Sequence, residues 1–256
     1  MTEAGRYETL SSARTVNMGD EWFDVANVDH FWIKRRLDVL VALCGSLLRD
    51  DARLAEVGCG SGLVQSQFED RLGLSIDGFD LNAEALERNA SRTGRLACYD
   101  VHERSEELRD RYDLVLLLDV IEHVQEDARF LEDSAFLAKP AGHLVVNVPA
   151  SPRLYSRYDV AAGHLRRYTP RALLEVGQKA GLEVASWTYW GLPLLPLAVA
   201  RKLLMPGVDD EQVIRAGFEP PGRLSNRVLT ALARLEPIPQ KLFGTSLLVL
   251  FRKSPR

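Results

Sequence analysis

The stretch "LAEVGCGSGLV", from Leu54 to Val64, places Gly58, Gly60 and Gly62 directly after a short apolar run. A run of this length suits a buried parallel strand. Glycine accepts positive φ and lets another group approach the backbone, so the spacing predicts a tight turn between a strand and a helix. In an open α/β sheet such a turn lies at the edge where ligands bind. The stretch therefore predicts either a ligand-binding loop or a closely packed structural turn.

Short apolar runs and helical patterns alternate around this stretch. The runs that suit buried strands are Leu54–Val57, Leu74–Phe79, Arg95–Tyr99, Leu114–Leu118 and His143–Val148. The helical patterns include Phe31–Leu48, Leu63–Leu72, Ala83–Ser91, Asp127–Leu137 and Thr169–Gly181. Strand and helix taking turns at this spacing predicts βαβ units and a parallel sheet covered on both faces.

Two further strand patterns follow in the C-terminal third of the chain. They are "LEVASWTYW" (Leu182–Trp190) and "TSLLVLFRK" (Thr245–Lys253), and we expect the second to be antiparallel, at or near an edge. The predicted fold is α/β, with a doubly wound, mostly parallel seven-stranded sheet, N-terminal helices and a proline-rich insert before the last strand.

Composition and charge narrow the classes of function. The 256-residue chain has a formal net charge of −4, which gives no support to nucleic-acid binding. Its cysteines, Cys44, Cys59 and Cys98, form no C-x-x-C pair, which suits a reducing compartment. The N-terminus lacks the pattern of a signal peptide, and no apolar run reaches the roughly 18–20 residues of a membrane span. We therefore expect a cytoplasmic protein.

Several motifs together resemble one family. The G-x-G-x-G spacing, preceded by Glu56 and followed by Leu63, departs from the G-x-G-x-x-G/A pattern of dinucleotide folds and resembles the first motif of class I S-adenosylmethionine-dependent methyltransferases. "LVLLLDVIEHV" and "LAKPAGHLVVNVP" resemble later motifs of this family, with Ala141 in place of a usual glycine. "HFWIKRR", "YDVAAGHLRRYTPRALLE" and "FGTSLLVLFRK" occur in this order in a bacterial subgroup related to the O-methyltransferases of ubiquinone synthesis. The resemblance spans about residues 30 to 253.

The resemblance implies a Rossmann-like domain in three parts. These are an N-terminal helical cap (1–52), a cofactor-binding core (53–150) and an acceptor-side region (151–256) that contains the insert at 190–243. The apolar part of the insert, 189–204, is expected to form a lid, a peripheral membrane contact or a dimer contact. The oligomeric state stays open.

Residues at the strand ends are candidates for binding the cofactor, S-adenosylmethionine. Asp80 ends the second strand pattern, where a carboxylate can accept hydrogen bonds from ribose hydroxyls; the alternative is a helix cap, a role that Asn82 can also fill. The resemblance places Asp100 near the adenine and Arg36 against the methionine carboxylate, with a solvated helix face as the alternative for Arg36. The predicted cofactor-binding residues are Arg36, Glu56, Gly58, Gly60, Gly62, Asp80, Leu81, Asp100, Leu118 and Asp119.

Asp119, Glu122 and His123 follow the fourth strand pattern and are candidates for the transfer chemistry. Histidine is a natural base near neutral pH, so we predict that His123 is catalytic. In the ubiquinone-pathway relatives, acidic residues and a His at these positions can bind a divalent metal. Asp119 stands where those relatives carry Glu, and we predict that no metal is required. The alternative for Glu122 and His123 is capping of a helix.

The segment "GHLRRYT", residues 163–169, supplies a second set of candidates in a long loop, where acceptor sites are often built. His164 is the second catalytic candidate. The predicted acceptor-binding residues are Arg166, Arg167 and Tyr168. The alternative is that the two arginines pair with Asp159 or Glu175 and fix the loop.

The sequence thus predicts an enzyme that moves a methyl group from S-adenosylmethionine to a small-molecule or lipid-like acceptor. Resemblance to the ubiquinone-pathway enzymes favours oxygen as the site, with in-line displacement and His-assisted deprotonation. A nicotinamide-dependent dehydrogenase is the first alternative, disfavoured by Leu63 and by the lack of a Tyr-x-x-x-Lys pattern. A cofactor-binding protein without turnover is the second.

Overall fold

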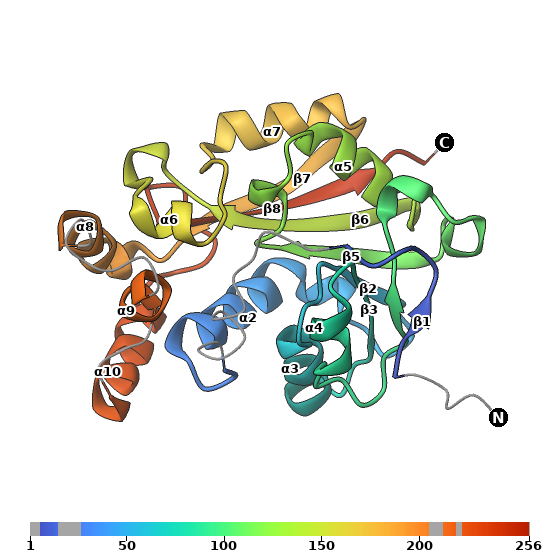
Figure 1. The fold of residues 1–256 in the computed structure, drawn as a ribbon. Coiled ribbons are helices and arrows are strands. Elements are labelled where there is room, and N and C mark those ends of the chain that lie inside the picture. The colour runs from blue at the N-terminus through green and yellow to red at the C-terminus, as the bar shows by residue number, and fades with distance from the viewer. Residues whose placement is uncertain (1–5, 15–26, 205–211, 219–221, 256) are drawn as a thin grey trace.

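The computed structural model describes residues 6–14, 27–204, 212–218 and 222–255. Within them one sheet has the strand order β1-β4-β3-β2-β5-β6-β8-β7 (Figure 1). The strands are β1 (Glu8–Thr9), β2 (Leu54–Val57), β3 (Ile76–Asp80), β4 (Leu96–Cys98), β5 (Tyr112–Leu118), β6 (Ala138–Pro149), β7 (Leu182–Trp190) and β8 (Ser246–Lys253). Neighbours from β1 to β6 run parallel, whereas β8 is antiparallel to both β6 and β7.

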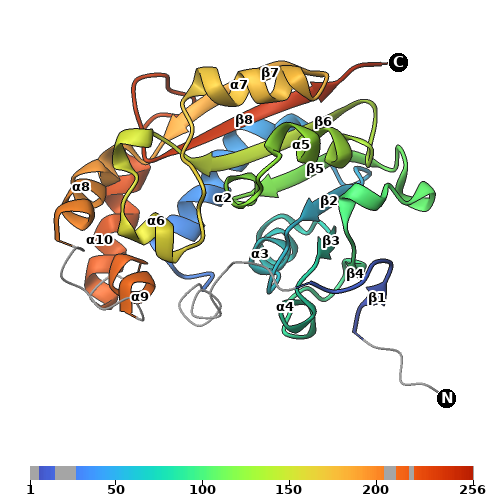
Figure 2. The ribbon, with the colours of Figure 1, turned by 45° about the horizontal axis from the view of Figure 1, so that its top comes forward.

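Helices cover both faces of the sheet (Figures 1 and 2). They are α2 (Phe31–Cys44), α3 (Leu63–Leu72), α4 (Ala83–Glu87), α5 (Asp127–Ala135), α6 (Arg157–Ala161), α7 (Pro170–Lys179), α8 (Leu195–Leu204), α9 (Val213–Phe218) and α10 (Arg223–Arg234). Strand β5 shows how the layers form, because its successive side chains point to opposite faces. Leu114 and Leu116 pack in the core with α2 and α3, while Val115 and Leu117 pack in the core with α5 and α7.

The predicted fold class is confirmed, with one more strand than the seven expected. The extra strand is β1, whose two residues pair with Ala97 and Cys98 at the far edge of the sheet. It lies within the segment 1–52 that the sequence assigns to a helical cap. A strand of two polar residues carries no hydrophobic period, so its pairing comes only from tertiary contact.

Helix α4 ends at Glu87, earlier than the predicted Ser91. The cause is Asn89, which is fully buried. Its side-chain amide donates to the carbonyl of Gly60 at 3.1 Å and to Oε1 of Gln65 at 2.9 Å. Helix α4 therefore ends before Asn89, whose side chain turns inward and stabilises the glycine loop.

The strand order reverses at β2 and β5, which are neighbours in the sheet. The carboxyl ends of these two strands thus form the crevice where open α/β sheets bind ligands. Helices α6, α8, α9 and α10 gather toward the same end of the molecule (Figure 1, left). Parts of the predicted insert, 205–211 and 219–221, lie outside the described residues. No helix in the described ranges is both long and apolar enough to cross a membrane.

Candidate active site

A cleft opens beyond the carboxyl ends of β2 and β5. Its volume is about 1460 Å³, including the space at its open mouth. The described residues that line it come from the glycine loop after β2 (residues 58–62), the start of α2, the segment after β5, and helices α6, α8 and α9.

Hydrogen bonds fix the glycine loop to the end of β3. The Gly60 N–H donates to Oδ2 of Asp80 at 2.7 Å, and the Asn82 N–H donates to Oδ1 of Asp80 at 2.8 Å. The side chain of Asn82 meanwhile accepts the N–H of Ala85 and caps α4. Asp80 therefore positions the loop, and each of its oxygens keeps a lone pair for a further donor.

Three ionisable side chains face the cleft beside this loop. Arg36, from α2, donates to Oδ2 of Asp119 at 2.6 Å. Burial raises the pKa of Glu56 to about 8 despite the nearby Arg36, and no described residue forms a hydrogen bond with its Oε2. Burial likewise raises the pKa of Asp119, although Arg36 and its hydrogen bond lower it. Two carboxyl groups thus share one guanidinium, an arrangement that favours a ligand with a positive centre.

Residues predicted at the next two strand ends lie beneath the N-terminal segment. The Arg14 guanidinium pairs with Oδ2 of Asp100 at 2.9 Å, and the Arg14 N–H donates to the carbonyl of Leu81 at 3.0 Å. The hydroxyl of Ser11 accepts the Asp100 N–H at 2.9 Å. Among the described residues, the cleft lining includes the predicted Arg36, Glu56, Gly58, Gly60, Leu118 and Asp119 but not Gly62, Asp80, Leu81 or Asp100.

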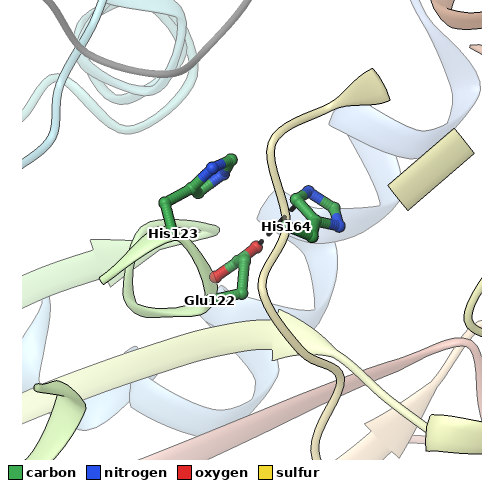
Figure 3. Close-up of side chains that lie close together, drawn as sticks. All are labelled: Glu122, His123 and His164. Carbon is green, nitrogen blue, oxygen red and sulfur yellow. Dashed lines mark ion pairs between the residues drawn. The ribbon is translucent and has the colours of Figure 1, made fainter. Parts of the chain in front are cut away.

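His123 and His164 come from different segments and meet in the cleft (Figure 3). Their ring centroids are 4.9 Å apart, with the rings at 83°. Burial, and to a smaller extent the neighbouring His164, lowers the pKa of His123 to about 4. Its ring is therefore neutral at pH 7 and able to accept a proton. His123 ends a 3₁₀ turn, Ile121–His123, and the N-cap of the next helix, α5, is Glu126, so neither Glu122 nor His123 takes the capping position of the alternative.

Glu122 lies beside the two histidines, and donor atoms of the three lie within 4.8 Å of one another (Figure 3). Both carboxyl oxygens of Glu122 are buried and have no hydrogen-bond partner in the described ranges, and burial raises the pKa of Glu122 well above the usual range. Two imidazole nitrogens and one carboxylate form a donor set that fits a divalent ion such as Zn²⁺. Asp119, which the sequence grouped with Glu122 and His123, is absent from this set and pairs with Arg36.

Arg167 fixes the loop that carries His164. It donates to Oδ1 of Asp159 at 2.7 Å and to the carbonyl of Ala150 at 3.1 Å. Burial acts to raise the pKa of Asp159, but the hydrogen bond from His164 and the charge of Arg167 lower it to about 2. The ion pair of Arg167 with Asp159 is one of the two that the sequence analysis gave as the alternative to acceptor binding. Arg167 nevertheless also lines the cleft.

Arg166 and Tyr168 lie away from the cleft. Arg166 pairs with Oδ2 of Asp127 at 3.0 Å, and the Tyr168 hydroxyl donates to the same oxygen at 2.9 Å. Neither residue is part of the cleft lining. The ion pair of Arg166 and the hydrogen bond of Tyr168 both end on Asp127, the first residue of α5. They therefore anchor the loop to the start of that helix.

Several residues that line the cleft were not predicted as site residues. They include His30, Trp32, Cys59, Ser61, Tyr158, Leu197, Arg201 and Phe218. His30 also caps α2, because its Nδ1 accepts the N–H of Trp32 at 3.2 Å while its Nε2 bonds the Phe218 carbonyl at 2.9 Å. The insert residues carry no motif, so only the packing of α8 and α9 over the cleft identifies them.

Comparison with known proteins assigns the family. A family model described as a methyltransferase domain matches residues 18–186. The ubiquinone biosynthesis O-methyltransferase of Aeromonas salmonicida is 26% identical over 222 residues, which cover 79% of this chain and 89% of that protein. The protein of the same name from Rhodopseudomonas palustris is 33% identical over 124 residues, and the match spans 46% of this chain and 49% of the relative.

Solved structures share the fold at lower identity. A SAM-dependent methyltransferase from Archaeoglobus fulgidus is 16% identical, with a TM-score of 0.53 over 87% of this chain and 96% of that one. Phosphoethanolamine N-methyltransferase 2 from Haemonchus contortus, solved with S-adenosyl-L-methionine, is 16% identical, with a TM-score of 0.56 over 87% of this chain and 53% of that one. With the family model covering most of the sheet, the chain belongs to the class I methyltransferases, the family that uses S-adenosylmethionine as its methyl donor.

Proposed function

We propose that the protein transfers a methyl group from S-adenosylmethionine to a hydroxyl oxygen of a small-molecule or lipid-like acceptor, with His123 as the base. The observation that carries this proposal is the neutral, buried ring of His123 in the same cleft as Gly60 and Glu56. The names of the relatives, ubiquinone biosynthesis O-methyltransferases, support oxygen as the methylated atom.

The residues at one end of the cleft fit the cofactor. Glu56 offers a buried, unpartnered oxygen for a positively charged group, and Arg36 offers a guanidinium for a carboxylate. Asp80 would accept ribose hydroxyls while it holds the Gly60 N–H. When bound, S-adenosylmethionine supplies a methyl group already activated on a sulfonium, so the chain has only to align the acceptor, exclude water and remove a proton.

His123 would remove the proton from the acceptor hydroxyl as the oxygen attacks. A pKa near 4 keeps its ring uncharged across the neutral range. His164 is the second candidate, because the Asp159 carboxylate, 3.0 Å from its Nδ1, orients its ring. A metal held by Glu122, His123 and His164 is the competing arrangement, favoured by the two unpartnered oxygens of Glu122.

The apolar part of the cleft lining supports a largely apolar acceptor. It includes Trp32, Leu194, Leu197 and Phe218, of which Leu197 comes from α8 and Phe218 from α9. The stretch 189–204 thereby contributes to the wall of the cleft, as a lid would, while Leu203 on the same helix is exposed.

Product analysis tests the proposal. The purified protein is incubated with S-adenosylmethionine labelled in the methyl group and with matched acceptors that carry a hydroxyl, an amine or neither on the same alkyl or aromatic body. We expect label in the ether product of the hydroxyl compounds. Label only in amine products would contradict oxygen as the site. Binding of S-adenosylhomocysteine without labelled product from any acceptor would favour the protein without turnover.

A further inference from the structure

Arg201 differs from the other arginines of the cleft. Arg36 pairs with Asp119 at 2.6 Å and Arg167 pairs with Asp159 at 2.7 Å. Arg201 lines the same cleft but forms no ion pair with any carboxylate of the described residues. The charge of Asp159 acts on Arg201 through space, but the ion pair of Asp159 is with Arg167.

Neighbouring helices hold the Arg201 guanidinium in place. Its Cζ lies 4.0 Å from the centre of the Tyr158 ring on α6, and Nη1 donates to the Gly217 carbonyl on α9 at 3.3 Å. A Cβ on Gly217 would lie 2.4 Å from the Tyr158 ring, so the absence of a side chain there lets these three elements meet. The group is fixed before any ligand binds, which lowers the entropy lost on binding.

One hydrogen-bonding atom of this group is unused. Nε of Arg201 is buried and has no hydrogen-bond partner among the described residues. Leu197, Ala198 and Ile214 line the cleft around it, and burial lowers the pKa of Arg201. The side chain as a whole is partly exposed, but a buried donor without a partner is costly, and an anion that enters the cleft would lower that cost.

The position of Arg201 separates it from the cofactor end. His123 contacts His164, whose ring is hydrogen-bonded to Asp159, and Tyr158, the next residue, carries Arg201 above its ring. Arg201 is therefore linked to His123 through Tyr158, Asp159 and His164, whereas the glycine loop follows β2.

We propose that Arg201 binds an anionic group, a carboxylate or a phosphate, at the end of the acceptor remote from the methylated oxygen. The planar guanidinium matches either group in two places. The acceptor is then an amphiphile, with an apolar body between an anionic group and the hydroxyl that faces His123. This inference rests on the proposed function, because it takes the occupant of this end of the cleft to be the methyl acceptor.

Simple amphiphiles test the inference without knowledge of the acceptor. Decanoate, decyl phosphate and decanol are titrated into the full-length protein by calorimetry, below their micelle concentrations, with S-adenosylhomocysteine present. We expect at least one of the two anions to bind tenfold or more tightly than decanol. Acetate and inorganic phosphate, which lack the apolar chain, should bind at least tenfold more weakly than their decyl counterparts. Equal binding of decanol and both anions by the wild type would overturn the inference, whatever any variant does.

Arg201→Gln should abolish the preference for the anion over decanol, and Arg201→Lys should retain part of it. The matched control is Lys202→Gln, which removes the same charge from the next residue of α8. Lys202 is exposed and donates to the Arg153 carbonyl, so its loss should leave the preference intact. An anion preference that survives in Arg201→Gln, or disappears equally in Lys202→Gln, would contradict the assignment.

Failure of this inference can be distinguished from failure of the proposed function. If S-adenosylhomocysteine binds and methyl products form, but the anions show no advantage, the Arg201 assignment fails and the function stands. If hydroxyl compounds give no methyl products, the proposed function fails. Titrations without S-adenosylhomocysteine then still report whether Arg201 selects an anion.

Discussion

Three glycines follow β2, and each position requires glycine for a reason of its own. A Cβ on Gly58 would lie 2.5 Å from Cγ2 of Val120, and one on Gly62 would lie 2.2 Å from Oδ1 of Asn89. Gly60 instead lines the cleft, where its N–H is held by a carboxylate. The spacing of the glycines predicts the turn, but it does not reveal that two of them are required by packing against residues distant in sequence.

Gly62→Ala should therefore destabilise the protein more than Gly73→Ala. Both residues have positive φ, 76° and 69°, so both variants incur the left-handed strain of roughly 1–2 kcal/mol. Only at Gly62 does the added Cβ displace Asn89, since nothing lies within 4 Å of a Cβ on Gly73. Urea unfolding should show a further loss of about 1 kcal/mol or more in Gly62→Ala. Equal losses would contradict the packing role of Asn89.

His123→Ala should lower the rate of methyl transfer by about 10²–10⁴-fold, the usual contribution of a positioned base. S-adenosylhomocysteine affinity should stay near that of the wild type. Protonated imidazole cannot accept a proton, and burial lowers the pKa of His123 to about 4. At saturating S-adenosylmethionine, protonation of His123 should therefore lower the wild-type rate only as the pH approaches 4.

The matched control is His102→Ala, because His102 pairs with Asp133 outside the cleft. Its rate should be that of the wild type. Full activity in His123→Ala would exclude the role as base. Activity lost with a chelator and restored by Zn²⁺ or Mg²⁺ would instead make Glu122, His123 and His164 metal ligands, and the base would have to lie elsewhere.

At the scale of the element, helix α2 begins at a histidine that must be neutral. Nδ1 of His30 accepts the Trp32 N–H, and burial lowers the pKa of His30 to about 4 from 6.5. The unfolded chain protonates His30 near pH 6.5, whereas the folded chain does so only near pH 4. Neutral His30 therefore contributes fully to the stability of the fold above pH 6.5, and this contribution is lost as the pH falls toward 4. The loss in the free energy of unfolding is about 3 kcal/mol. His30→Asn, which retains a capping acceptor, should show a shallower loss of stability over this range in urea unfolding; an unchanged pH dependence would contradict this account.

The loop between α6 and α7 should depend on one arginine and not on its neighbour. Arg167→Ala leaves the buried Asp159 carboxylate without its guanidinium, which typically costs about 3–5 kcal/mol. Arg166 and Asp127 are both partly exposed, so Arg166→Ala should cost at most about 1 kcal/mol. Thermal unfolding of the two variants measures the difference. A similar, small loss in both would mean that Asp159 finds another partner.

The helices and strands that the sequence predicts are those whose own apolar residues repeat at helical or strand spacing. Leu63–Leu72 is a helix over the predicted residues, and Thr169 caps α7 by accepting the Ala172 N–H. Strand β1 and the early end of α4 were missed because pairing with β4 and the inward turn of Asn89 decide them. In the same way, the sequence places His123 at a strand end, but only the tertiary fold brings His164 beside it.

At the scale of the whole molecule, the cleft joins two parts of the fold that the chain builds separately. Strands β2, β3 and β4 extend the sheet in one direction, and β5, β6, β8 and β7 extend it in the other. Glu56 is the next-to-last residue of β2, in one half, and Asp119 directly follows β5, in the other. Arg36, from α2, pairs with Asp119 and lowers the pKa of Glu56, so its charge acts on both halves.

A ligand that contacts both halves should therefore stabilise the whole fold. S-adenosylhomocysteine at 100 times its Kd should add about 2.7 kcal/mol to the free energy of unfolding, provided that it binds only the folded state. For a chain of this size that corresponds to a rise in Tm of roughly 5–10 °C. NAD should leave Tm unchanged, because Leu63 stands where a dinucleotide loop has a third small residue beside the helix. Thermal scans with each ligand at matched concentrations measure both effects. A rise with NAD and none with S-adenosylhomocysteine would mean that the glycine loop serves a different cofactor.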